Sequence, residues 1–473
     1  MNQKPLFLNH KKPHIHFIGI GGIGMSGIAE IFHLRGFIVS GSDKADSETL
    51  QRLKVLGVKT YIGHHADNIT GASVIVYSSA VKFDNPEIVA AKKESIPIIP
   101  RAEALGELMR GKIGIAVAGT HGKTTTTSLL STVFTHAKLD PTCIIGGKVD
   151  ALGGNAKSGS GEYMIAEADE SDGSFLQLPA TYAIITNIDN DHLDHYGSVE
   201  NIDDAFSRFV GHLPFYGLAM VCADDPGIKR VLKDFKKPYK TYGFSKTNDY
   251  YIELNPSVGH QTKFSVYFDS QKIAEVEINI LGKHNALNAL SVFALSHQMG
   301  LSIPIICEGL KSFSGVKRRF ETKYLDQKNN IRIVDDYGHH PTEITATLLA
   351  AKQLAENKRI IAVFQPHRYS RTQSCIDDFA SCFSDCDTLF LTPIYSAGEH
   401  PIAGINSEFL VEKINQSKYK PKKILGPFDL ESMPREILKT IKPGDLVLCL
   451  GAGSITQLPA LLISSLINHK GFE

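Results

Sequence analysis

A lysine and a threonine at the start of one predicted helix could bind the phosphates of a nucleotide. They lie in AGTHGKTTTTSLL, residues 118–130, between the apolar stretch IAVAG and a helical pattern. In this strand–loop–helix context, loop N–H groups and the helix dipole converge on an anion. We expect Lys123 to reach the β- and γ-phosphates and the Thr124 hydroxyl to bind Mg²⁺. The loop starts late, because Val117 stands where the full pattern has its first glycine. A chance Gly-Lys-Thr in a turn is the alternative, which the flanking pattern disfavours.

Two further side chains stand near the ends of predicted strands in the same block. Glu167 ends the strand YMIA and opens EADESD, and His192 lies in NIDNDHLDH, just beyond the strand YAIIT. The carboxyl ends of parallel strands form the ligand crevice of an open sheet. A carboxylate there suits Mg²⁺, which prefers oxygen ligands. Spacing alone leaves His192 open as a metal ligand or as a histidine of a surface loop.

A second glycine-rich loop lies near the N-terminus. The segment GIGGIGMSG places Gly19, Gly21 and Gly24 in G-x-G-x-x-G register between a predicted strand and a predicted helix. Asp43 follows at the end of the second strand. This pattern is typical of a diphosphate bound at a helix N-terminus, and close packing of helix on strand is the alternative. The motif does not say which diphosphate is bound.

Strands that alternate with helices predict an α/β fold with largely parallel sheets. A chain of 473 residues is long for one core, and strands restart in three blocks. We therefore expect a Rossmann-like N-terminal domain over residues 1–110, which carries the glycine-rich loop near the N-terminus. A central P-loop ATPase-like domain with a mainly parallel sheet is expected over 111–322, and a Rossmann-like C-terminal domain over 323–473. Alternation within 250–280 predicts an antiparallel insert in the central domain.

Composition excludes several classes of protein. Lys plus Arg equal Asp plus Glu, at 50 each, so no global field favours nucleic acid or an anionic membrane. No apolar run is long enough for a membrane span or a secretory signal. Among the seven cysteines, Cys375, Cys382 and Cys386 are spaced for one face of a helix and are expected to pack in the core rather than bind metal. These features predict a cytoplasmic enzyme in a reducing compartment.

The order of the motifs resembles that of the Mur ligase family, which forms amide bonds on UDP-linked peptidoglycan precursors. The motifs are GTHGKT at 119–124, EADES at 167–171, NIDNDH at 187–192 and GKHN at 282–285. The family's phosphate loop begins at the late glycine, so the loop here is the family's own form. The resemblance covers essentially the whole chain and implies ATP and Mg²⁺ as cofactors.

Within the family, several motifs are similar to those of the member that adds L-alanine. They are FIGIGGIGMSGIAE, ESDGSFL, DDYGHHPTE and QPHRYSRT. Later-acting members use a carbamylated lysine beyond the histidine that matches His192, and no lysine lies between His192 and Leu213. The member that recycles a tripeptide usually has tyrosine at Ser171 and lacks the HRYSRT pattern. It stays the nearest alternative, with folate polyglutamylating ligases as a further one.

The resemblance implies a reaction in two steps. The lactyl carboxylate of UDP-N-acetylmuramate attacks the γ-phosphate of ATP, and the amine of L-alanine then displaces phosphate from the acyl phosphate. Lys123 and Mg²⁺ would neutralise the transferring group, and a second Mg²⁺ would hold the substrate carboxylate. The implied catalytic residues are Lys123, His192 and Glu167. The implied metal ligands are Thr124, Glu167 and His192.

The other site residues are carried over motif by motif. ATP binding is assigned to Gly119, Thr120, His121, Gly122, Lys123, Thr124, Thr125, His284, Asn285, Arg319 and Asp336. The UDP end of the substrate is assigned to Gly21, Gly22, Ile23, Gly24, Ser78, Ser79 and Arg101. The amino acid and the sugar-linked substrate are assigned to Tyr337, His339, Arg368 and Arg371. Helix capping is the alternative for His284 and Asn285, and a solvated cation is the alternative for Arg319.

The expected partners are the small-molecule substrates UDP-N-acetylmuramate and L-alanine, without nucleic acid or membrane insertion. A monomer or weak homodimer is expected, with domain closure on binding. Two other classes of protein stay open. An NAD-dependent oxidoreductase would explain the first glycine loop and Asp43 but would leave Lys123 and Thr124 without a role. A P-loop switch or motor ATPase would hydrolyse ATP without an amino acid or a UDP-sugar.

Overall fold

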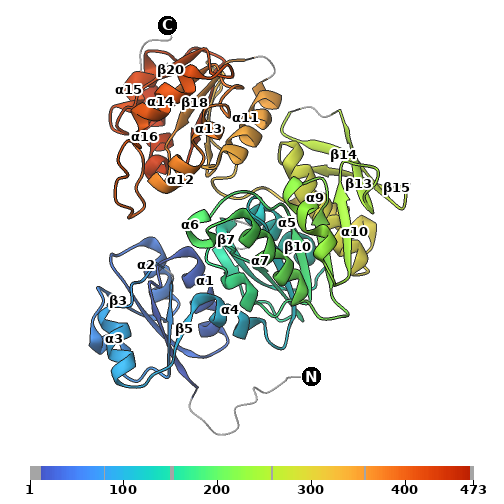
Figure 1. Cartoon of the computed structure of the whole chain (residues 1–473), viewed down its shortest axis with the longest axis vertical. Coiled ribbons are helices and arrows are strands. Elements are labelled where there is room, and N and C mark those ends of the chain that lie inside the picture. The colour runs from blue at the N-terminus through green and yellow to red at the C-terminus, as the bar shows by residue number, and fades with distance from the viewer. Residues whose placement is uncertain (1–11, 79, 150–153, 257–258, 356–357, 469–473) are drawn as a thin grey trace. The chain divides into compact units, whose positions relative to one another are not determined.

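The structure is a computed structural model that describes residues 12–78, 80–149, 154–256, 259–355 and 358–468. These residues form three β-sheets of five, ten and six strands. Helices lie between the strands along the chain, as Figure 1 shows. This alternation confirms the predicted α/β class.

The first sheet, in the blue part of Figure 1, is parallel and has the strand order β3-β2-β1-β4-β5. Its strands are β1 (His14–Ile18), β2 (Ile38–Asp43), β3 (Lys59–Ile62), β4 (Val74–Tyr77) and β5 (Ile98–Pro100). Its helices are α1 (Ile23–Leu34), α2 (Glu48–Val55), α3 (Pro86–Lys93) and α4 (Arg101–Met109). The strand order reverses between β1 and β4, and such a reversal opens a ligand crevice at the carboxyl ends of the strands.

The second sheet has the strand order β15-β14-β13-β12-β11-β10-β6-β9-β7-β8. Its strands are β6 (Ile113–Ala118), β7 (Thr142–Val149), β8 (Gly154–Lys157), β9 (Tyr163–Glu167), β10 (Tyr182–Ile185), β11 (Leu218–Cys222), β12 (Tyr239–Gly243), β13 (Tyr250–Asn255), β14 (Thr262–Phe268) and β15 (Gln271–Ile278). The pairings from β7 through β9, β6, β10 and β11 to β12 are parallel. The neighbours β14 and β15 are joined by only Asp269 and Ser270, which requires an antiparallel pair, as predicted for this insert.

The helices of this part pack closely enough to fix the phosphate loop. They are α5 (Lys123–His136), α6 (Leu193–Tyr196), α7 (Val199–Gly211), α8 (Pro226–Val231), α9 (Lys283–Gln298) and α10 (Ile303–Ser312). Helix α5 buries Leu130 and Phe134 completely. A Cβ at Gly309 of α10 would lie 2.9 Å from the Cα of Val133 in α5, so a small residue lets the two helices approach.

The third sheet, in the orange and red part of Figure 1, has the order β16-β17-β21-β18-β19-β20. Its strands are β16 (Glu321–Asp326), β17 (Ile331–Asp336), β18 (Ile360–Phe364), β19 (Thr388–Leu391), β20 (Lys423–Leu425) and β21 (Leu446–Leu450). Its helices are α11 (Pro341–Ala355), α12 (Tyr369–Ser374), α13 (Ile376–Phe379), α14 (Ser407–Gln416), α15 (Met433–Leu438) and α16 (Leu458–Ile467). Only the edge pairing of β16 with β17 is antiparallel among the pairings in this described sheet.

Both faces of the third sheet are buried. Val334 and Ala362 belong to one apolar core and Ile333 and Ile361 to another, because successive strand residues point to opposite faces. The three cysteines at positions 375, 382 and 386 lie in the first of these cores, as predicted. They do not share the one continuous helix that the spacing predicted, since α13 is only four residues long and ends at Phe379.

The chain divides into two compact units. One comprises Met1–Glu253, Val266–Ala274 and Asn288–Phe313, and the other comprises Leu254–Ser265, Glu275–Leu287 and Ser314–Glu473. The first sheet and the phosphate loop belong to the first unit, in which α1 packs against β7 and β8. Within the described residues, every helix is too short or too polar to cross a membrane.

Candidate active site

The phosphate loop connects β6 to α5 and needs glycine at both ends. Gly119 and Gly122 have φ angles of 129° and 83°, a region that L side chains rarely adopt. A Cβ at Gly119 would lie 2.1 Å from Oγ1 of Thr186, and a Cβ at Gly122 would lie 2.9 Å from Oδ1 of Asn288. Val117 is instead a fully buried strand residue, which explains why the loop begins at the later glycine.

The segment after β10 holds the loop in shape. The His121 amide donates to Oδ1 of Asn187 at 2.8 Å, and Nδ2 of Asn187 donates to the His121 carbonyl at 3.0 Å. Thr186 donates to the same carbonyl at 2.6 Å. The Asp189 amide donates to Oγ1 of Thr120 at 2.9 Å, and Nε2 of His121 lies 2.9 Å from Oδ2 of Asp189. The loop is therefore preorganised by its neighbour strand.

Lys123 is turned back into the loop. Its Nζ donates to the carbonyls of Gly119 and Thr120 at 2.6 and 3.0 Å and to Oε1 of Glu170 at 2.8 Å. Burial alone would lower the pKa of Lys123, but neighbouring carboxylates, Glu170 foremost, raise it. The lysine is therefore charged and held where a phosphate would lie. Thr124 and Thr125 follow in the first turn of α5.

Three carboxylates crowd against this one lysine. Glu167 is the last residue of β9, and Asp169 and Glu170 follow it. The Glu170 side chain is only 2% exposed, and burial raises its pKa to about 7 although Lys123 opposes this shift. Its Oε2 is buried without a hydrogen-bond partner among the described residues. Sequence reasoning passed over Glu170, although the three acidic residues in EADES were a usable signal.

His192 faces the same cluster. It has a φ of 58° at the start of α6, and its Nε2 lies 3.7 Å from Oε1 of Glu170 and 3.8 Å from Oδ2 of Asp191. The hydroxyl of Tyr196 donates to the Glu170 carbonyl at 2.5 Å. The imidazole is 20% exposed. The fold thus brings His192 to the acidic edge, while its binding of a metal stays a prediction.

The residues at this edge fit Mg²⁺. The carboxylates of Glu167, Asp169 and Glu170 are opposed by two cations, Lys123 and the Arg101 guanidinium on Asp169, so the cluster carries an excess of negative charge when all three carboxylates are ionised. Oε2 of Glu170 is buried and accepts no hydrogen bond from the described residues, so a cation could satisfy it. Hard oxygen donors of this kind are those that Mg²⁺ prefers.

The Glu167 side chain also packs against the backbone of the neighbouring strand β7. Glu167 closes β9, which pairs in parallel with β7. A Cβ at Gly146 in β7 would lie 2.0 Å from Oε2 of Glu167. Glycine at this position therefore leaves the space that the carboxylate occupies.

The N-terminal glycine loop lies at the reversal of the first sheet. Gly19, with a φ of 81°, donates from its amide to the Ser42 carbonyl at 2.8 Å. A Cβ on Gly19 would lie 3.7 Å from the Cβ of Ser78, which follows β4. The Gly21 amide donates to Oδ2 of Asp43 at 2.8 Å. Asp43 thus fixes the conformation of the loop. This structural role explains an aspartate at position 43 without a bound dinucleotide.

Gly22 caps α1, and Ile23 and Gly24 form its first turn. Arg101, the first residue of α4, lies against this turn, since a Cβ at Gly24 would be 3.2 Å from Nη1 of Arg101. Nη2 of Arg101 donates to Oδ2 of Asp169 at 2.8 Å. Ser79 lies outside the described residues.

The other residues predicted for ATP belong to the second unit. His284 lies near Arg319, and burial together with this guanidinium lowers the pKa of His284 to about 4, so the imidazole is neutral at pH 7. Nδ2 of Asn285 donates to the Leu281 carbonyl at 2.7 Å. This hydrogen bond gives the amide a structural role at the start of α9.

Asp336 is buried, and its carboxylate organises the turns around it. Oδ2 accepts from the Phe320 amide and Oδ1 from the Gly338 amide, each at 2.7 Å. Burial raises the pKa of Asp336. These bonds hold two loops of the second unit in place, and a part for Asp336 in ATP binding stays a prediction.

Three of the four residues predicted for the amino acid, Tyr337, His339 and Arg371, are connected through His367 at the carboxyl ends of β17 and β18. The Nε atom of the fourth, Arg368, lies 4.0 Å from Oε1 of Glu399. The rings of Tyr337 and His339 lie 5.4 Å apart, and those of His339 and His367 lie 5.6 Å apart. Nη1 of Arg371 lies 3.4 Å from Nδ1 of His367. Arg368, with a φ of 71°, follows His367 directly. His367 was missed in the sequence, although it stands within the motif QPHRYSRT.

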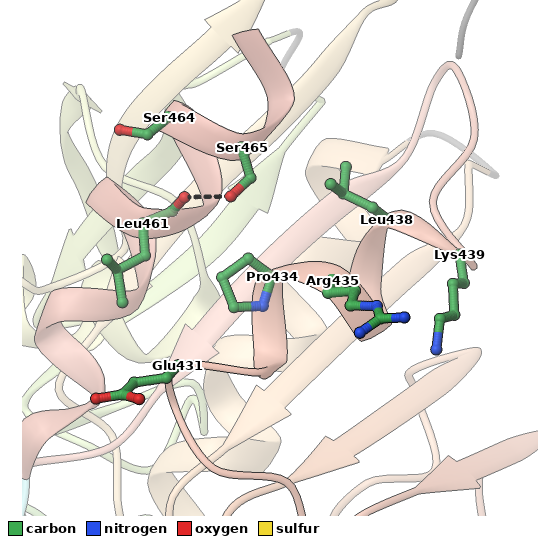
Figure 2. A pocket seen from close by; sticks show the side chains of 8 residues that line it. All are labelled: Glu431, Pro434, Arg435, Leu438, Lys439, Leu461, Ser464 and Ser465. Carbon is green, nitrogen blue, oxygen red and sulfur yellow. Dashed lines mark hydrogen bonds between the residues drawn. The ribbon is translucent and has the colours of Figure 1, made fainter. Parts of the chain in front are cut away.

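A separate groove of about 600 Å³ lies between α15 and α16 (Figure 2). Its lining comprises Glu431, Pro434, Arg435, Leu438, Lys439, Leu461, Ser464 and Ser465. None of the predicted site residues lines this groove. The groove is therefore separate from the phosphate loop and from the residues predicted for the amino acid.

A preorganised phosphate loop beside an acidic strand edge defines a nucleotide-dependent enzyme of the α/β class. Three domain descriptions match the chain in order: "Mur ligase family, catalytic domain" over 14–113, "Mur ligase middle domain" over 117–296, and "Mur ligase, glutamate ligase domain" over 318–453. The chain belongs to the Mur ligase family. The resemblance found in its motifs is confirmed, as is the three-part α/β architecture.

Known relatives extend over almost the whole chain. The chain is 48% identical over 453 residues to the UDP-N-acetylmuramate–L-alanine ligase of Trichlorobacter lovleyi, covering 96% of this chain and 98% of that protein. It is 49% identical to the ligase of the same name from Solidesulfovibrio magneticus, covering 97% and 99%.

Solved structures agree with this family. The UDP-N-acetylmuramate–alanine ligase of Thermotoga maritima matches with a TM-score of 0.81 and 31% identity, over 97% of this chain and 100% of that chain. A murein peptide ligase of Psychrobacter arcticus matches over the same shares with a TM-score of 0.70 and 25% identity.

Proposed function

We propose that this protein joins L-alanine to the lactyl carboxylate of UDP-N-acetylmuramate and converts ATP to ADP and phosphate, as a step of peptidoglycan synthesis. The observation that carries the proposal is the 48% identity, over 96% of the chain, to a relative named for this reaction. The phosphate loop and the acidic edge supply the chemistry that such a ligation needs.

The reaction must make a poor electrophile reactive. A lactyl carboxylate oxygen attacks the γ-phosphorus of ATP, the bond to the leaving oxygen of ADP breaks, and an acyl phosphate forms. The alanine amine then attacks the acyl carbon, phosphate leaves, and the amine gives up a proton. Because two anions must meet in the first step, neutralisation and alignment are the main catalytic tasks.

Lys123 performs the neutralisation in this proposal. Its Nζ already lies on the carbonyls of the loop that would cradle the phosphates, and it exchanges Glu170 for phosphate oxygens when ATP binds. Thr124, Glu167 and His192 would hold Mg²⁺, which neutralises phosphate charge when bound. Before ATP binds, the Glu170 carboxylate lies between Lys123 and His192 and orients both side chains.

The remaining substrate contacts are part of the same proposal. The ATP contacts are Gly119, Thr120, His121, Gly122, Thr125, His284, Asn285, Arg319 and Asp336. The contacts to the UDP end are Gly21, Gly22, Ile23, Gly24, Ser78, Ser79 and Arg101. The contacts to the amino acid and the sugar-linked substrate are Tyr337, His339, Arg368 and Arg371, whose two guanidinium groups suit an α-carboxylate.

We also propose domain limits of 1–110, 111–322 and 323–473. The short interval between Met109, where α4 ends, and Ile113, where β6 begins, supports the first limit. A monomer or weak homodimer in the cytoplasm is proposed, because ATP and sugar nucleotides are available there.

Phosphate release from ATP tests the proposal. Purified protein is given ATP, Mg²⁺ and UDP-N-acetylmuramate, and amino acids are added one at a time. Release is expected only with L-alanine and not with D-glutamate or the tripeptide. Release that needs the tripeptide would assign the protein to the recycling members of the family, and release from ATP alone would refute a ligase.

A further inference from the structure

One arginine touches both the glycine loop of the first domain and the acidic edge of the second. The guanidinium of Arg101 covers the first turn of α1, where a Cβ at Gly24 would lie 3.2 Å from Nη1 and 3.3 Å from Cδ. Its Nη2 donates to Oδ2 of Asp169 at 2.8 Å. Asp169 stands two residues after Glu167. All these residues belong to one compact unit.

The N-terminal turn of α1 is a suitable binding position for a diphosphate. The first N–H groups of a helix have no partner within the helix and attract anions. A guanidinium beside them offers a planar fork that matches phosphate as well as carboxylate. Arg101 can give its fork fully to only one of these anions. A diphosphate on this turn would therefore compete with Asp169 for Arg101.

We propose that Arg101 is shared between Asp169 and the diphosphate of the sugar nucleotide, and that Asp169 is a positioning residue that couples this diphosphate to the acidic edge. The inference rests on the proposed function. Without substrate, Asp169 holds the guanidinium against α1. When the diphosphate binds, it takes over the guanidinium and Asp169 loses its partner.

The loss of the Arg101–Asp169 ion pair would affect the phosphate loop. Asp169 is fixed in its segment, because its Oδ1 accepts from the Ser171 amide at 3.1 Å, and its charge acts on Lys123. Once Arg101 turns to the diphosphate, the negative charge beside Lys123 is less well balanced. A nucleotide that brings a divalent cation is then favoured. By linkage, the nucleotide favours the sugar nucleotide by the same factor.

The competing explanation is that the Arg101–Asp169 ion pair has only a structural role. The two explanations predict different changes in the affinity for the sugar nucleotide when Asp169 loses its charge. Asp169→Asn keeps the acceptor for the Ser171 amide but removes the charge that competes for Arg101. Under the proposal, this variant binds the sugar nucleotide more tightly than the wild type when no ATP is present. Under a purely structural role, it binds equally or less tightly.

The experiment is isothermal titration calorimetry of the full-length protein with UDP-N-acetylmuramate. For the partly exposed Arg101–Asp169 pair, we expect the Kd of Asp169→Asn to fall by about two- to fivefold. Asp172→Asn is the matched control, since Asp172 carries the same charge nearby and accepts from the Ser174 amide at 3.0 Å. Its Kd should equal that of the wild type. Repeating the titration with a non-hydrolysable ATP analogue and Mg²⁺ should strengthen wild-type binding more than binding by Asp169→Asn.

Unchanged or weaker binding by Asp169→Asn would overturn the inference, while wild-type binding itself would leave the proposed function standing. A wild-type protein that does not bind UDP-N-acetylmuramate would overturn both. If Asp169→Asn does not fold, Arg101→Lys serves instead. It should weaken binding of the sugar nucleotide alone and leave that of ADP alone unchanged, whereas equal losses for both ligands would contradict a shared arginine.

Discussion

Gly146 offers a way to misplace Glu167 without removing it. A Cβ at Gly146 would stand 2.0 Å from Oε2 of Glu167, whereas ordinary contact begins at 3.4 Å. Gly146→Ala must therefore displace this oxygen by about 1.4 Å. The glutamate side chain can absorb that movement, and the φ of Gly146 lies outside the left-handed region. The fold should thus survive while the proposed metal ligand is moved.

Misplacement of a reacting or positioning group by about 1 Å costs on the order of 100-fold in rate. We therefore expect kcat/KM for phosphate release to fall about 100-fold, which corresponds to about 2.7 kcal/mol. The free energy of unfolding should change by less than about 1 kcal/mol, because Gly146 is exposed. Raising the Mg²⁺ concentration should restore part of the activity.

The control is Gly211→Ala, for which an added Cβ meets no heavy atom within 4 Å. Its activity should match that of the wild type. Steady-state phosphate release across a Mg²⁺ titration measures both variants, and denaturant unfolding measures their stability. Wild-type kcat/KM in Gly146→Ala would refute the assignment of Glu167 to the site, as would a loss of activity explained by unfolding alone.

Three further changes test other parts of the account. Lys123→Met should reduce phosphate release by at least about 10³-fold in the release assay. The variant protein should still fold, as circular dichroism would show, because Glu170, whose pKa is already about 7, can stay buried in its protonated form. Asn155→Ala should lower the unfolding free energy by about 1–2 kcal/mol in denaturant titrations, since Asn155 is buried and donates to the Ile23 carbonyl at 2.5 Å. The folded-state pKa of His284 is about 4, below its ordinary 6.5, so the unfolded state binds more protons between these values. Wild-type stability should therefore fall relative to that of His284→Gln by roughly 2–3 kcal/mol as the pH drops from 6.5 to 4, which denaturant unfolding at each pH measures.

The sequence was sufficient wherever one short segment carries both the element and its chemistry. The strand, the glycines and Lys123 follow one another within a single segment, so the phosphate loop could be predicted from spacing. Glu167 and His192 were singled out because each stands near the end of a predicted strand, and the family resemblance then implied their roles. The antiparallel insert and the buried cysteine at position 375 were also predicted, because both depend on local periodicity.

Contacts made by strand pairing could not be predicted in this way. Glu170 meets Lys123 and His192 only because β9, β6 and β10 lie side by side in the second sheet. The partner of Arg101 lies 68 positions away in the chain, and no periodicity connects the two. Burial then decides which carboxylate is perturbed, and burial depends on the whole fold.

The most direct test of the proposed reaction follows one oxygen atom. UDP-N-acetylmuramate carrying ¹⁸O at both oxygens of its lactyl carboxylate is incubated with the protein, ATP, Mg²⁺ and L-alanine, and the released phosphate is analysed by mass spectrometry. The account predicts one ¹⁸O in each phosphate formed, together with a UDP-sugar product heavier by one alanine residue. Phosphate without ¹⁸O would show that the carboxylate never attacked ATP and would contradict the ligase mechanism.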